Sequence, residues 1–169
     1  MGEAIIRAFV CLAALAVATS VWSPAPASGE PPPGTRCGVD LSAPMITEAI
    51  HRLRPAFPDT DVAWSPVPYG GNFDPCATLS TALVTVERAT GSSPDHALFF
   101  HHGEYLGTAT WVPYPFTSLN VPLTTDDTVV LEYKDGRYGC TACPGPVTIV
   151  RYQWQRDRVQ MLDPPPPGP

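Results

Sequence analysis

Apolar residues recur at the spacing of an amphipathic helix early in the chain, just after a proline-rich stretch. Residues three and four positions apart lie on one face of a helix, so these side chains form a single stripe. Ser42 is placed to cap the helix, Pro44 is tolerated in its first turn, and Pro55 stops it. The stripe of this predicted helix comprises Met45, Ile46, Ala49, Ile50 and Leu53.

The pattern becomes that of β-strands further along the chain. Short runs of β-branched, aromatic and aliphatic residues alternate with turn residues there. His102-Gly103-Glu104 and Arg156-Asp157 each separate two such runs and predict hairpins. The predicted strands cover residues 61–67, 79–87, 97–101, 105–110, 128–134, 147–155 and 158–162.

One helix in front of strands joined by short turns predicts an α+β fold. We expect the N-terminal helix to pack on one antiparallel β-sheet in a single, small, disulfide-stapled domain. The length of 169 residues fits one domain, and 44% hydrophobic residues suffice for a modest core. The formal charge is −6, and Lys134 is the one lysine. Without a basic run, nucleic acid is not an expected partner.

The N-terminus has the order of a secretory signal peptide. A start carrying Arg7 is followed by the apolar residues 8–18 and the small residues Ala25 and Ala27. This apolar stretch is shorter than a membrane-spanning helix, so no membrane span is expected. The predicted organisation is a signal peptide at 1–27, a Pro-rich linker at 28–36, the domain at 37–163 and a Pro-rich tail at 164–169. An uncleaved signal acting as an anchor is the alternative.

Five cysteines bear on anchoring and stability. Cys11 lies too early in the apolar stretch for a lipobox and Cys37 too late, so we expect no lipid anchor. Signal cleavage leaves four cysteines, which allow three pairings in an oxidising compartment. We predict Cys37–Cys76 and Cys140–Cys143, since the latter two are within one turn of each other.

The sequence offers weak candidates for chemistry. Cys140-Thr141-Ala142-Cys143 resembles a redox motif, but prolines and a strand follow it instead of a helix that would stabilise a thiolate. His101 and His102 are adjacent and would point to opposite faces of a strand, so with His96 and Glu104 they do not predict a metal site. We therefore predict no catalytic, cofactor-binding or metal-binding residues.

A candidate partner surface lies between two predicted strands. Residues 111–117 interleave the rings of Trp111, Tyr114 and Phe116 with prolines that exclude a central strand. Extended prolines would present three aromatic anchors to a partner. The alternative is that the rings fold back and cap one end of the core.

Several segments resemble the LppP/LprE lipoprotein family of mycobacteria. They are residues 72–77 (Asn-Phe-Asp-Pro-Cys-Ala), 98–108, 127–130, the turn at 140–144 and 150–154. The resemblance spans about residues 37–164 and implies an exported cell-envelope protein with no established enzyme activity. We expect a non-enzymatic, secreted or envelope-bound interaction domain. The alternatives are a thiol-redox protein using Cys140 and Cys143 and an envelope enzyme of unrecognised type.

Overall fold

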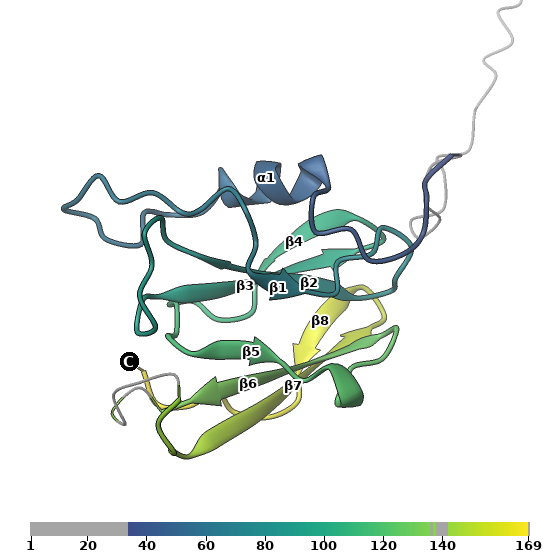
Figure 1. The fold of residues 1–169 in the computed structure, drawn as a ribbon. Helices are drawn as coiled ribbons and strands as arrows, with labels where there is room; N and C mark the ends of the chain where they lie inside the picture. The colour runs from purple at the N-terminus through teal and green to yellow at the C-terminus, as the bar shows by residue number, and fades with distance from the viewer. Residues whose placement is uncertain (1–33, 136, 138–141, 169) are drawn as a thin grey trace, which may run out of the picture.

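The computed structural model describes residues 34–135, 137 and 142–168. Eight strands form two four-stranded antiparallel sheets, with strand orders β1-β2-β3-β4 and β5-β6-β7-β8 (Figure 1). The elements are α1 (Pro44–Ile50), β1 (Gly70–Gly71), β2 (Ser80–Thr85), β3 (Asp95–His101), β4 (Glu104–Thr108), β5 (Thr117–Leu119), a 3₁₀ helix η1 (Val121–Leu123), β6 (Thr128–Lys134), β7 (Val147–Gln155) and β8 (Arg158–Met161).

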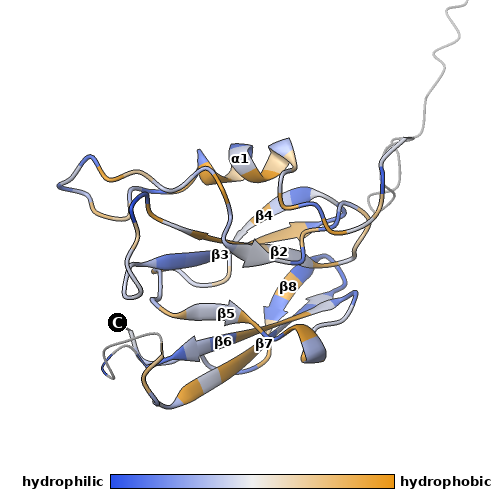
Figure 2. Cartoon of the chain, viewed as in Figure 1, coloured by the Kyte–Doolittle hydropathy of each residue, from blue (hydrophilic) through white to orange (hydrophobic). Residues whose placement is uncertain are grey.

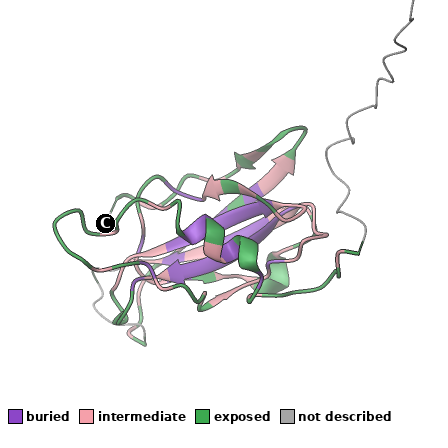
Figure 3. Ribbon diagram, turned by 90° about the horizontal axis from the view of Figure 1, so that it is seen from above, coloured by how far each residue is buried: buried purple, intermediate pink, exposed green. Residues whose placement is uncertain are grey.

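The first sheet is the middle of three layers, with α1 on one face and the second sheet on the other (Figures 1 and 3). Alternation along β2 and β3 divides their side chains between these faces. Leu98 and Phe100 pack toward the α1 side, whereas Ala97 and Phe99 pack toward the second sheet. Both strands are therefore buried on both faces, and apolar residues occur along α1 and both sheets (Figure 2).

The predicted α+β fold with one sheet is wrong. The structure is mostly β, with two antiparallel sheets and one short α-helix. The strand pattern alone does not say how many sheets the strands form. The informative signal was the run of consecutive apolar residues at 82–84 in β2 and at 97–100 in β3, because such runs do not alternate and are typical of strands covered on both faces.

The helix is also shorter than predicted. It begins after Ala43, which makes no side-chain cap, and ends at Ile50. Ser42 instead donates its hydroxyl to the Asp40 carboxylate at 2.6 Å. Ile46, Ala49 and Ile50 are buried as expected from the stripe. The helix covers the outer face of the first sheet together with residues from the segment that follows it, among them Leu53, Val62 and Trp64.

Several strand boundaries agree with the sequence pattern. Strands β6 and β7 have the predicted bounds, and both predicted hairpins are present. The first hairpin turns at His102 and Gly103, which both have positive φ, at 46° and 80°. This pair of left-handed residues matches the twist that a tight hairpin requires. The predicted strand at 61–67 is wrong, because only an isolated bridge joins Trp64 to Val86.

The two sheets meet along one side of the molecule. Strand β5 lies against β1, β2 and β3, which joins the sheets there. At the other end of each strand order, β4 and β8 pair with one neighbour apiece and form free edges. The sandwich is thus open between β4 and β8.

Candidate functional site

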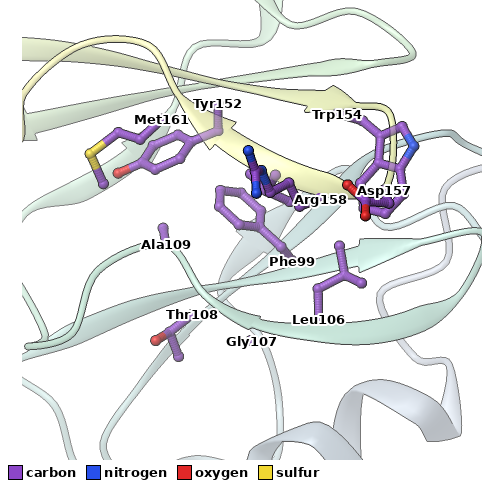
Figure 4. A pocket seen from close by; sticks show the side chains of 11 residues that line it. Phe99, Leu106, Gly107, Thr108, Ala109, Tyr152, Trp154, Asp157, Arg158 and Met161 are labelled. Atoms are coloured by element: carbon purple, nitrogen blue, oxygen red, sulfur yellow. The ribbon is translucent and has the colours of Figure 1, made fainter.

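The opening between β4 and β8 contains a cavity of about 390 Å³ (Figure 4). Binding pockets for small molecules usually measure about 300–1,000 Å³ and are mostly apolar. Aromatic and aliphatic side chains make up most of this lining, and we call the cavity the edge groove. Its lining residues are Phe99, Leu106, Gly107, Thr108, Ala109, Tyr152, Trp154, Asp157, Arg158, Val159 and Met161.

Two buried rings from the central strands form the floor of the edge groove. Phe99 on β3 and Tyr152 on β7 have ring centroids 4.9 Å apart. Gly107 on β4 pairs with Phe99 and has a φ of 136°, which L side chains rarely adopt. A side-chain carbon built there meets no atom within 4 Å. A side chain at Gly107 would therefore project into open space, and the positive φ is what favours glycine there.

The two hydroxyl groups in the lining of the edge groove are already paired within the protein. The Thr108 hydroxyl donates to the Thr110 carbonyl at 2.8 Å, and the hydroxyls of Tyr152 and Tyr133 lie 3.0 Å apart. Burial raises the pKa of Tyr152 to about 12, so this phenol stays neutral at physiological pH. In the described part of the chain, the side chains of Asp157 and Arg158 have no ion-pair or hydrogen-bond partner.

Trp154 connects the edge groove to the first hairpin. Its ring stacks on the His101 ring with a centroid separation of 3.8 Å and an interplanar angle of 13°. The Nδ1 atom of His101 lies 2.6 Å from the Thr78 carbonyl, and that of His102 lies 3.1 Å from the Cys76 carbonyl. Because a carbonyl only accepts, each Nδ1 must carry the proton. These histidines thus hold the loop at 76–78 and one wall of the groove.

The expectation that His101 and His102 point apart is wrong. Their ring centroids lie 4.3 Å from each other, because His102 belongs to the turn and not to the strand. Across the described residues, no three His, Cys, Asp or Glu side chains gather into a metal-binding group.

The three rings of the candidate partner surface occupy different environments. Trp111 is 79% exposed, and the Arg54 guanidinium lies 4.2 Å from its ring centroid. Tyr114 is buried, with its hydroxyl donating to the Pro166 carbonyl at 3.0 Å, so the Pro-rich tail contacts the domain. Phe116 is half-buried beside the Lys134 ammonium group. The structure does not bring the three rings together on one surface.

The structure contains the Cys37–Cys76 disulfide, the first of the two pairs expected from the sequence. Cys143 is also disulfide-bonded. Cys140, the partner expected for it, lies outside the described residues, as does the predicted signal peptide. Residues 144–146 lead directly from Cys143 into β7 without a helix.

His96 on β3 is buried, whereas its sequence context favours a solvated histidine near the hairpin. Its ring lies 5.2 Å from that of Trp64, and its Nδ1 atom is buried without a hydrogen bond. Burial disfavours the imidazolium and lowers the pKa of His96 to about 4. The unfolded chain therefore takes up this proton at a higher pH than the folded protein does.

We expect the stability of the protein to fall between pH 7 and pH 4.5. A histidine pKa lowered from 6.5 to about 4 removes on the order of 3 kcal/mol as the pH falls through that interval. The neighbouring Asp95 has a pKa raised by burial, which acts in the opposite direction at the acidic end. Urea denaturation at pH 7 and pH 4.5 measures the change in the free energy of unfolding, and this change should be smaller for His96→Leu than for the wild type. The exposed His51→Gln should retain the wild-type difference, and an unchanged difference in His96→Leu would contradict this explanation.

Comparison with known proteins places the chain in a family. The model of the LppP/LprE lipoprotein family matches residues 71–157, just over half of the chain. The chain belongs to the LppP/LprE lipoprotein family. This match includes β3, β4 and β7, which build much of the edge groove.

Similar curated proteins come from mycobacteria and carry the name "Putative lipoprotein LprE". The chain is 29% identical over 138 residues to that of Mycobacterium leprae, covering 82% of this chain and 65% of the relative. It is 29% identical over 126 residues to that of Mycobacterium tuberculosis, covering 75% and 58%. The chain thus spans roughly three fifths of the length of these relatives. No solved structure matches the chain.

Within the described residues, no helix is long and apolar enough to cross a bilayer.

Proposed function

We propose that this protein is a non-enzymatic, exported cell-envelope domain that binds an apolar ligand in the edge groove. Family membership and the Cys37–Cys76 disulfide support an extracytoplasmic location, since disulfides persist in oxidising compartments. Export would use residues 1–27 as the signal peptide and 28–36 as a linker. The Sγ atom of Cys37 is bonded to that of Cys76, which leaves no free thiol at Cys37 for a lipid anchor and supports an unlipidated mature protein.

The apolar lining of the edge groove carries the proposal of binding. The floor rings of Phe99 and Tyr152 are buried, whereas Leu106 at the wall is 40% exposed and Met161 is half-buried. Covering this wall with a ligand would remove apolar surface from water, which is favourable by about 25 cal/mol per Å². The paired hydroxyls of Thr108 and Tyr152 favour a binding role over nucleophilic chemistry.

Binding of the neutral fluorescent dye N-phenyl-1-naphthylamine tests this function. We expect saturable binding to the mature domain, and a roughly fivefold weaker affinity for Leu106→Asn, because the substitution removes apolar contact area from the wall. Leu123→Asn is the matched control, since Leu123 is 55% exposed on η1, away from the groove. Absence of binding, or equal weakening in both variants, would refute a ligand site in the edge groove.

A further inference from the structure

The lining of the edge groove includes a positively charged side chain, Arg158, that makes no ion pair within the described residues. Two arginines near in sequence or space have partners within the protein: Arg151 pairs with Asp163 at 2.8 Å, and Arg54 lies over Trp111. What distinguishes Arg158 from the other exposed arginines without an ion pair is its place in the lining of the groove. Arg158 has no ion-pair partner among the described residues, although it lines the same cavity as the buried floor. Figure 4 shows its side chain among the rings that line the opening.

We propose that the edge groove binds a single-chain amphiphile whose anionic head pairs with Arg158. This inference rests on the proposed function and names its ligand class. The chain would lie on the rings of Phe99 and Tyr152. The guanidinium of Arg158 offers a planar set of donors that matches a carboxylate or phosphate with two parallel hydrogen bonds.

The size and charge of the groove narrow the ligand further. A volume of about 390 Å³ is near the lower end for binding pockets and suits one chain. The Asp157 carboxylate lines the same cavity and repels negative charge, so the single Arg158 guanidinium favours a head with one negative charge over a head with two. The ligand head should therefore carry one negative charge.

The net negative charge of the protein makes a preference for anionic amphiphiles a specific test of Arg158. A formal charge of −6 produces an overall field that favours cations over anions. A preference for an anionic amphiphile must therefore arise locally, at Arg158. An amphiphile bound only through its chain would follow the overall field or show no preference for charge.

Displacement of the naphthylamine dye by three twelve-carbon amphiphiles, each below its critical micelle concentration, tests the inference. Dodecanoate should bind about tenfold more tightly than dodecanol or dodecyltrimethylammonium, as expected for one charge-assisted interaction. Arg158→Gln should abolish this advantage and leave dodecanol binding unchanged. Arg156→Gln is the matched control, because Arg156 lies in the same hairpin but outside the lining, and it should behave as the wild type.

The outcomes separate the inference from the proposed function. If the dye binds but dodecanoate binds no more tightly than dodecanol, or if Arg158→Gln still prefers dodecanoate, the inference of an anionic head group is refuted. The proposal of an apolar ligand site is then unaffected. If neither dye nor amphiphile binds the folded wild type, both proposals fall. Circular dichroism spectra and melting temperatures of each variant establish that a lost advantage does not reflect unfolding.

Discussion

Replacing Cys37 and Cys76 together by Ser is expected to lower the free energy of unfolding by about 3–4 kcal/mol, measured by urea denaturation. The disulfide joins residues 39 positions apart, and closing a loop of that size restricts the unfolded chain by about this amount in the chain-entropy model. Its loss should make α1 the first element to detach, because the segment after Cys37 leads into that helix.

Two hydrogen bonds beside the disulfide join the same two segments of the chain. The Asp40 N–H donates to the Phe73 carbonyl at 2.9 Å, and the Gly38 N–H donates to the Asp74 carboxylate at 3.0 Å. These bonds join the segment before α1 to the loop before β2. These two hydrogen bonds should weaken once the disulfide is removed. The estimate of about 3–4 kcal/mol covers only the entropy of the unfolded chain and does not include the loss of these bonds.

The second predicted pair provides the control for loop length. A bridge between Cys140 and Cys143 would close a very short loop, worth only about 2 kcal/mol in the same model. Serine at both positions should therefore cost about half as much as serine at Cys37 and Cys76. A loss below 1 kcal/mol for the Cys37 and Cys76 variant would contradict the role assigned to that disulfide.

Local sequence patterns identified most elements of this fold because their determinants are local. Strands β6 and β7 have clear β-branched and aromatic runs, and the turns at His102-Gly103 and Arg156-Asp157 delimit hairpins. Strand β5 was missed because it has three residues and directly follows the proline-containing loop. Its order in the second sheet depends on pairing with β6, which no local pattern reveals.

The edge groove could not be read from the sequence, because its lining comes from strands far apart in the chain. Phe99 and Tyr152 are 53 positions apart and meet only because the two sheets face each other. Gly107 was the available local signal, since a glycine within a strand often marks a place where space is left or another group approaches. Arg158 has no distinguishing pattern before its surroundings are known.

Substitution of Tyr114 by Ala is expected to cost about 3–5 kcal/mol in the free energy of unfolding, the usual range for removing a large buried ring. Tyr114 is 8% exposed, and its ring packs edge-on against Tyr133 with centroids 5.3 Å apart. Tyr114→Phe should cost only about 1 kcal/mol, because it removes the hydrogen bond to Pro166 and keeps the ring.

Trp111→Ala should behave differently and cost less than about 1 kcal/mol, since this ring is 79% exposed and makes a cation–π contact with Arg54 at the surface. Urea denaturation of the three variants decides between the two interpretations of residues 111–117. A large loss for Tyr114→Ala with a small loss for Trp111→Ala means that Tyr114 caps the core and that, of these two rings, Trp111 remains available as an aromatic anchor. Equal, large losses would place both rings in the core and end the proposal of a partner surface there.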